Sequence, residues 1–270
     1  MVHGWMDVSA SYQFVVDALQ AERHIIAPDW RGFGLSTGPW CDHYAFADYL
    51  GDLECLLDHY APGQAVDLVG HSMGGNVAMM YAGVRPERIH RLINLEGFGM
   101  PQTRPAQAPG RYARWLDEIR AVGQGGLALK TYDSLEAVAA RLRKTNPRLA
   151  HDKSLWLAGH WAQAETAEDG QTRWRILGEE AHKVVSAQLF RVDEMLEIMQ
   201  RITAPVLAVE ASDDSLAQWW KGQYSLDEYH QRLQRVACCE VARLQEAGHM
   251  LHHDQPTALA RLIEDFLDRK

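Results

Sequence analysis

Short apolar runs alternate along the chain with longer segments in which apolar residues recur every three or four positions. Runs of the first kind are typical of strands buried in a parallel sheet, and segments of the second kind are typical of amphipathic helices. We expect strands at residues 24–29, 65–69, 89–95, 205–209 and 239–244, and helices at about 42–60, 74–84 and 256–267. This alternation predicts an α/β fold, a mostly parallel sheet with helices on both faces.

Residues 100–203 interrupt this alternation, because their periodicity predicts only helices, at 111–121, 134–144, 152–162 and 179–201. We therefore expect a core made of residues 1–99 and 204–270, with residues 100–203 inserted as a helical lid. The lid contains four tryptophans, Trp115, Trp156, Trp161 and Trp174. Core packing would account for most of them, and we expect the others to line a pocket under the lid.

The composition is that of a globular protein, because 47% of the 270 residues are hydrophobic and 23% are charged. The formal net charge of −9 would repel a phosphate backbone, so we expect no nucleic-acid partner. Neither a signal-peptide pattern nor 18 consecutive apolar residues occur, which favours a cytoplasmic protein without a membrane partner. The four cysteines do not have the spacing of a disulfide framework, and we expect Cys238 and Cys239 to be buried free thiols in a strand.

The strongest local motif is Gly70-His-Ser-Met-Gly74, which lies directly between an expected strand and an expected helix. A G-x-S-x-G motif in this context is typical of a nucleophile elbow, a sharp turn that exposes the serine hydroxyl above the sheet. The helix that follows offers free backbone N–H groups to a developing oxyanion. We therefore predict that Ser72 is the nucleophile of a hydrolase.

A serine nucleophile needs a neighbouring base. Residues 247–253, Ala-Gly-His-Met-Leu-His-His, follow the last expected strand, so their loop lies at the same sheet edge as Ser72. We predict that His249, directly after the glycine, is the base, and that His252 and His253 begin the last helix. A metal site made of these histidines is the weaker interpretation, because no second set of carboxylate and histidine residues accompanies them. We expect neither a metal nor an organic cofactor.

These motifs resemble those of the α/β-hydrolase superfamily, in its lidded branch of small serine esterases and C–C hydrolases, over nearly the whole chain. His3-Gly-Trp5 resembles the oxyanion loop of that family, which implies that the backbone N–H groups of Trp5 and Met73 are the oxyanion donors. Residues 29–36 resemble the family's D-x-R-G-x-G-x-S stretch. The glycines of this stretch do not form a dinucleotide-binding loop, because Pro39 follows and no helix begins there.

The carboxylate that would orient the base has more than one candidate. Alignment of residues 205–209 with a strand of the family implies that Asp214 is the acid, in the family's order Ser72, Asp214, His249. Glu96 ends the strand at 89–95, where the related haloalkane dehalogenases place their acid, and it remains an alternative. Asp213 is the third candidate. If Glu96 is not the acid, we expect its side chain to be a buried, hydrogen-bonded carboxylate that supports the lid hinge.

The resemblance implies a serine hydrolase that cleaves a small to medium carboxylic ester through an acyl-enzyme, as a monomer or homodimer. We expect Trp5, His71, Trp156 and Trp161 to contact this small-molecule substrate. A C–C bond hydrolase or a lactonase would use the same residues. From other classes, a non-catalytic ligand-binding protein and an inactive fragment remain alternatives.

The family has about 25–30 residues before its His-Gly pair, and these form strands, one of them central in the sheet. His3 is the third residue of this chain. We therefore expect those strands to be missing and the sheet to retain unpaired backbone groups, each costing roughly 1–3 kcal/mol when buried.

Overall fold

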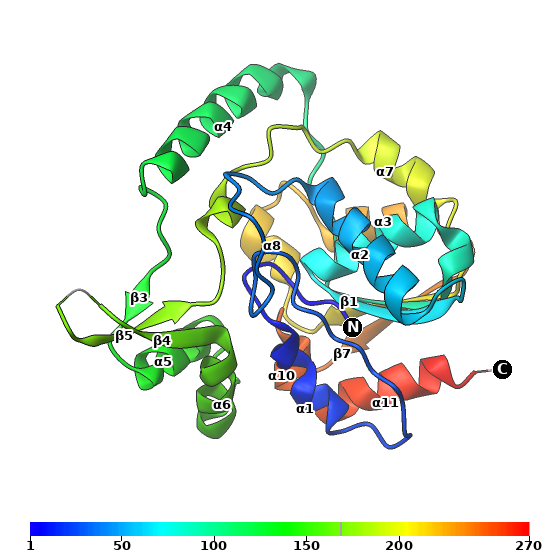
Figure 1. The fold of residues 1–270 in the computed structure, drawn as a ribbon. Helices are drawn as coiled ribbons and strands as arrows, with labels where there is room; N and C mark the ends of the chain where they lie inside the picture. The colour runs from blue at the N-terminus through cyan, green and yellow to red at the C-terminus, as the bar shows by residue number, and fades with distance from the viewer. Residues whose placement is uncertain (168, 270) are drawn as a thin grey trace.

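A parallel sheet of four strands forms the centre of the molecule (Figure 1). The computed structural model describes residues 1–167 and 169–269. The strands are β1 (Val66–His71), β2 (Ile89–Leu95), β6 (Val206–Ala211) and β7 (Cys239–Leu244), in the order β1-β2-β6-β7. All three pairs of neighbours are parallel. The α/β fold with a mostly parallel sheet is confirmed.

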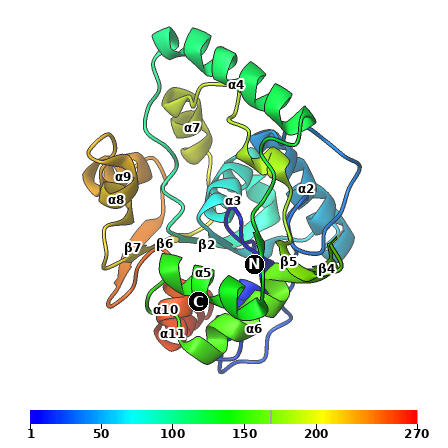
Figure 2. The ribbon, with the colours of Figure 1, turned by 90° about the vertical axis from the view of Figure 1, so that its left-hand side faces the viewer.

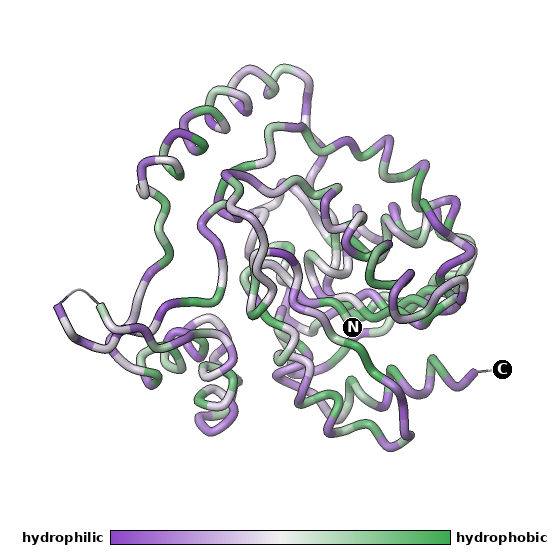
Figure 3. Tube along the Cα trace, viewed as in Figure 1, coloured by the Kyte–Doolittle hydropathy of each residue, from purple (hydrophilic) through white to green (hydrophobic). Residues whose placement is uncertain are grey.

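Helices cover both faces of this sheet. Successive side chains of each strand point to opposite faces, so each face has its own apolar cluster for helices to pack against. On β2, Leu92 packs in one core cluster while Ile93 packs in the other. The first face is covered by α2 (Phe46–Tyr60), α3 (Met73–Val84), α7 (Val192–Met199) and α9 (Leu226–Leu233), and the second by α1 (Gln13–Val16), α10 (Leu251–Asp254) and α11 (Pro256–Leu267). Figure 3 shows the strands as a mainly hydrophobic layer between these helices.

The expected strand at 24–29 is wrong, since these residues form no strand in the structure. Pro28 has no backbone N–H to donate to a ladder. Beside β1, the position expected for a further strand holds a single parallel bridge between Val2 and Gly70. The Val2 N–H donates to Val69 O at 2.8 Å, and the terminal ammonium group of Met1 donates to Ile26 O at 2.7 Å. These two bonds connect residues 24–29 to the sheet.

The insertion at residues 100–203 contains a small sheet as well as helices. Its helices α4 (Ala108–Gly123), α5 (Leu135–Thr145) and α6 (His151–Trp161) lie where the periodicity predicts them. The antiparallel sheet has the order β3-β5-β4, with β3 (Thr131–Tyr132), β4 (Ala162–Thr166) and β5 (Thr172–Ile176). Figures 1 and 2 show that this sheet lies beside α5 and α6, whereas α4 stands away from the central sheet.

Two further expectations about these elements are wrong. The single helix expected at 179–201 is divided into a 3₁₀ turn at Glu180–Lys183 and α7 (Val192–Met199), joined by extended chain. Cys238 lies in a bend before β7 and is exposed, and Cys239 is only partly buried, because β7 is an edge strand. None of the helices in the described part of the chain is long and apolar enough to span a membrane.

The turn between β1 and α3 places residue 72 at the carboxyl end of the sheet. Ser72 has φ +51° and ψ −114°, a backbone conformation that costs a non-glycine residue about 1–3 kcal/mol. The turn also brings Gly74 against the N-terminal segment, where an added Cβ would overlap the carbonyl oxygen of Val2. Only glycine fits at position 74 without displacing that backbone.

We expect Gly74→Ala to lower the free energy of unfolding by about 1–3 kcal/mol, because its methyl group has no space. The matched control is Gly159→Ala in α6, where no atom lies within 4 Å of an added Cβ. That change should raise stability by about 0.5–1 kcal/mol through helix propensity. Denaturant unfolding of both variants measures the difference, and equal stabilities would contradict the close approach at Gly74.

Candidate active site

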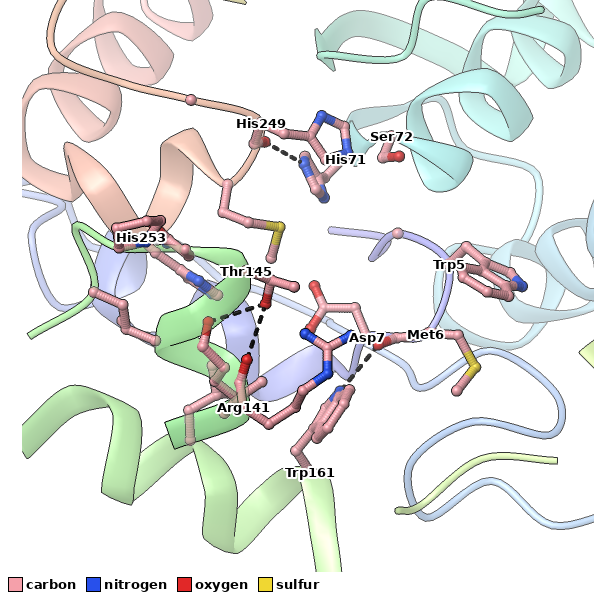
Figure 4. A pocket seen from close by; sticks show the side chains of 18 of the residues that line it. Trp5, Met6, Asp7, His71, Ser72, Arg141, Thr145, Trp161, His249 and His253 are labelled. Atoms are coloured by element: carbon pink, nitrogen blue, oxygen red, sulfur yellow. Dashed lines mark hydrogen bonds between the residues drawn. The ribbon is translucent and has the colours of Figure 1, made fainter. Parts of the chain in front are cut away.

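A pocket of about 1010 Å³ lies between the core and the insertion (Figure 4). From the core, it is lined by residues that include Gly4, Trp5, Asp7, His71, Ser72 and His249. From the insertion, it is lined by residues that include Leu129, Tyr132, Arg141, Leu149 and Trp161. The predicted nucleophile and the predicted base therefore face the same cavity.

Ser72 is held by the sheet through its backbone. Its N–H donates to Leu95 O of β2 at 2.8 Å, so the strained turn is fixed to the neighbouring strand. The side chain is half-buried and faces the pocket. Figure 4 shows the imidazole rings of His71 and His249 beside it.

His249 lies on the loop after β7, and this loop is tied to the end of β6. The Ala247 carbonyl oxygen accepts hydrogen bonds from the Ser212 hydroxyl at 3.2 Å and from the Asp213 N–H at 3.0 Å. The ring of Trp219 packs edge-on against the imidazole, with 4.0 Å between ring centroids. These contacts fix the position of the ring above the carboxyl edge of the sheet.

Glu96 is the carboxylate that contacts His249. The His249 Nδ1–H donates to Glu96 Oε2 at 3.2 Å, which leaves Nε2 free to accept a proton. Glu96 Oε1 accepts the Ala211 N–H at 2.7 Å, and the Glu96 N–H donates to Val209 O at 3.0 Å. The residue itself has φ +56°, so the chain turns sharply after β2 and directs the side chain across the sheet edge.

The two other candidate acids have different partners. Asp214 is the N-cap of α8 (Ser215–Trp220), and its Oδ1 accepts the Ala217 N–H at 2.8 Å. Asp213 forms an ion pair with Arg148 of the insertion, at 2.7 Å between Nη1 and Oδ2. No hydrogen bond joins either carboxylate to His249 within the residues that the structure describes. The geometry thus differs from the expectation that Asp214 orients the base.

Burial determines the charge states of this pair. Desolvation raises the pKa of Glu96 to about 7, the Ala211 N–H and Ser215 lower it, and the charges of Asp214 and Asp213 add to the increase. Desolvation also holds the pKa of His249 well below its usual range. At neutral pH the imidazole is therefore neutral, which is the form that can accept a proton.

The loop of residues 3–5 passes directly over Ser72. An added Cβ at Gly4 would lie 3.0 Å from His71 Nδ1 and 3.2 Å from Ser72 Cβ. Buried His3 holds this loop, because its Nδ1–H donates to Gly4 O at 2.8 Å and its Nε2 accepts the Trp30 N–H at 3.0 Å. The backbone N–H of Met73 is in the first turn of α3, where such groups have no partner within the helix.

Three of the four residues expected to contact a substrate line the pocket. Trp5, His71 and Trp161 line the pocket, and the Trp161 indole N–H donates to Met6 O at 3.0 Å. Trp156 does not line it; its ring packs against Phe14 of α1, at 5.5 Å between centroids. Trp219 was not predicted, because Gln-Trp-Trp on a short helix after β6 gave no specific signal.

The chain belongs to the α/β-hydrolase fold family, whose model matches residues 1–256. It is 26% identical over 274 residues to a serine hydrolase-like protein of Danio rerio, covering 98% of this chain and 80% of that protein. It is 39% identical over 144 residues to a cis-3-alkyl-4-alkyloxetan-2-one decarboxylase of Shewanella oneidensis, covering 52% and 43%. It is 33% identical over 103 residues to a 2-hydroxy-6-oxo-2,4-heptadienoate hydrolase of Pseudomonas putida, covering 37% of each.

Among solved structures, the crystal structure of a hypothetical protein from Pseudomonas aeruginosa superposes with a TM-score of 0.83. The identity is 24%, with 99% of this chain and 90% of that chain covered, so this likeness concerns the fold. The family match and the enzymes among the curated relatives identify the protein as an enzyme of the hydrolase class.

We expect Glu96→Gln to lower kcat by about 10²–10⁴-fold, since an amide does not hold the imidazole in the required tautomer. Asp214→Asn is the matched control, and it should lose less than tenfold in rate and keep nearly the wild-type stability, because asparagine caps a helix about as well as aspartate. Rates and melting temperatures of both variants decide between the two carboxylates. The reverse ranking of rates would contradict the assignment of Glu96.

Proposed function

We propose that this enzyme cleaves small to medium carboxylic esters through an acyl-enzyme on Ser72. The observation that carries the proposal is the His249–Glu96 hydrogen bond at the sheet edge that also presents Ser72 to the pocket. A serine on a strained elbow, a neutral histidine and a buried carboxylate are the groups that acyl transfer requires.

In this mechanism the Ser72 hydroxyl oxygen attacks the substrate carbonyl carbon while His249 Nε2 takes its proton. Glu96 accepts the hydrogen bond from Nδ1 and stabilises the imidazolium that forms. The oxyanion is bound by the Trp5 and Met73 N–H groups, the donors implied by the His-Gly-Trp loop and the elbow. Collapse of the tetrahedral intermediate expels the alcohol, which takes the proton from His249.

Water then attacks the acyl-enzyme, with His249 again as the base, and the carboxylic acid leaves Ser72.

The acid limb of the pH profile follows from the two pKa shifts. Because the pKa of Glu96 is raised to about 7, its ionised form is present above that pH and is lost below it. His249 stays neutral throughout this range, since burial lowers its pKa.

The pocket walls indicate which substrates fit. Leu129, Leu149, Leu157 and Trp161 supply apolar surface for an acyl or alkyl chain. Lys130 and Arg141 also line the pocket, and neither lies within ion-pair distance of a carboxylate in the described residues. An ester with a second, anionic group would match both kinds of wall.

These cations also favour a second candidate, hydrolysis of a C–C bond in a dicarbonyl acid. The same serine, histidine and carboxylate would serve, and Arg141 would hold the acid group. The two candidates differ in the leaving group, which is an alcohol for an ester and a carbanion equivalent for a C–C bond. Turnover of a β-diketo acid without turnover of esters would favour the second.

We expect Ser72→Ala to abolish ester hydrolysis and labelling by a fluorophosphonate probe, because no other pocket hydroxyl is activated by His249. Far-ultraviolet circular dichroism should show an unchanged fold, since the elbow accepts a smaller side chain. Ser186→Ala, outside this pocket, is the control and should label like wild type. Labelling of Ser72→Ala, or turnover above a tenth of wild type, would refute the nucleophile.

We expect kcat/KM of the wild type to fall as the pH drops below about 7, since protonated Glu96 cannot accept the Nδ1–H of His249. The residual activity of Glu96→Gln should show no such limb, because an amide does not titrate. The Asp214→Asn variant should keep the acid limb of the pH profile. A limb of the same midpoint in Glu96→Gln would assign the titration to another group.

We expect Arg141→Gln to raise KM about fivefold for an ester with a second carboxylate, relative to its effect on a neutral ester of equal length. One partly exposed ion pair contributes up to about 1 kcal/mol, which corresponds to that factor. Arg173→Gln is the control, as an insertion arginine outside the pocket. Equal changes for both esters would show that Arg141 does not recognise the anion.

A further inference from the structure

Behind Ser72, three buried residues form a cluster that the proposed hydrolysis does not use as reacting groups. Asp7 follows the loop over the nucleophile, His71 ends β1, and His252 is in α10. The exposed fractions are 6%, 2% and 0%. One ligand atom of each lies within 4.8 Å of one ligand atom of the others, and Asp7 Oδ2 is 3.9 Å from His252 Nε2.

The hydrogen bonds around this cluster leave four of its nitrogen and oxygen atoms without partners in the described residues. His71 Nε2 lies 2.8 Å from the carbonyl oxygen of His249, so Nε2 carries the proton and Nδ1 keeps a bare lone pair. In the described part of the chain, Asp7 Oδ2, His71 Nδ1 and both nitrogens of His252 have no hydrogen-bond partner. Such unpaired groups are costly to bury.

The side chains cannot satisfy one another directly. The 3.9 Å between Asp7 Oδ2 and His252 Nε2 is too long for a hydrogen bond. Asp7 Oδ2 and His71 Nδ1 are both acceptors, so neither can donate to the other. A group placed between the three residues must therefore offer positive charge or donated protons to two acceptors at once.

The other polar atoms of His71 and Asp7 are anchored as those of metal ligands usually are. A ligating histidine donates its second N–H to a carbonyl or carboxylate, and a ligating carboxylate is itself hydrogen-bonded. His71 donates Nε2–H to His249 O, and Asp7 Oδ1 accepts a hydrogen bond from the Ser11 hydroxyl. Burial also lowers the pKa values of His71 and His252 well below 6.5, which keeps both rings in the neutral, ligating form.

We propose that Asp7, His71 and His252 bind one first-row transition-metal ion, with Zn²⁺ as the best match. Two nitrogens and one carboxylate oxygen with an open fourth position are a common set for this ion. Ligands at about 2.1 Å from a tetrahedral ion lie roughly 3.4 Å apart, so the three side chains need only small movements to converge. The ion would join the N-terminal loop, the end of β1 and α10.

Such an ion would lie next to the nucleophile without being required by the ester chemistry. His71 directly precedes Ser72, and it contacts the backbone of His249. A metal ion bound at this site would hold the backbone segments of His71 and His249 together. The site does not rest on the proposed function, because binding can be measured without any substrate.

The test is a titration of the whole protein, first treated with a chelator, with Co²⁺ followed by visible absorption and with Zn²⁺ followed by calorimetry. We expect one equivalent of either ion, a four- or five-coordinate Co²⁺ spectrum, and a melting temperature about 5 °C higher at a hundredfold excess over Kd. Asp7→Asn and His252→Gln should each weaken binding at least tenfold. Asp17→Asn and His24→Gln change exposed residues of the same types and should bind like wild type.

Binding below one equivalent, or binding unchanged in both cluster variants, would overturn the proposal and leave a buried water as the partner of these atoms. Melting of each variant in chelator shows whether it folds. If neither folds, X-ray absorption of the wild-type zinc complex decides. Two imidazole ligands would support the site, and a shell of oxygen alone would refute it.

Discussion

The hydrogen-bond ladder at the carboxyl ends of β1, β2 and β6 is the constraint on which the site depends. The Ser72 N–H donates to Leu95 O of β2. The N–H of Glu96, which follows Leu95, donates to Val209 O, and the Glu96 carboxylate accepts the Ala211 N–H. Nucleophile and acid are therefore positioned by backbone bonds within the sheet. A parallel sheet places all carboxyl ends at one edge, so residues far apart in sequence meet there.

This arrangement has a cost, which the rest of the core must offset. Two residues of the edge, Ser72 and Glu96, have positive φ, and Glu96 is a buried carboxylate. Backbone strain of about 1–3 kcal/mol per residue is a large part of a typical stability of about 5–15 kcal/mol. Two apolar clusters, one on each face of the sheet, support the strands that carry this strain.

Four of the five expected strands, the turn at Ser72 and the position of His249 at the sheet edge could be predicted because their signals are local. The run before Ser72 and the glycines around it define the turn without knowledge of the remaining fold. Glu96 could not be distinguished from Asp214 in the same way. The choice depends on the turn at Glu96 and on the register of β2 against β6, where Leu95 pairs with Val209. Neither follows from the sequence of one segment.

The insertion was harder to predict, since its elements are stabilised by contacts with the core and with one another. β4 and β5 pair as antiparallel strands, but their residues have no strict alternation of apolar and polar positions, so the periodicity predicted neither strand. Cys238 shows the same limit at the sheet edge. Whether an apolar run is covered depends on its neighbours and not on its own composition.

The insertion contacts the loop after β6 through an exposed ion pair, Arg148 with Asp213. The Arg148 guanidinium also lies beside Gly248, the residue directly before His249, and 3.9 Å from Asp254 Oδ2. Exposed charge pairs weaken as dissolved salt shortens the Debye length to about 8 Å at 0.15 M ionic strength. Beside the apolar packing of Leu149 and Leu157 on Val8, one contact between the insertion and the core at the pocket is thus electrostatic, and its strength depends on the surrounding electrolyte as well as on the fold.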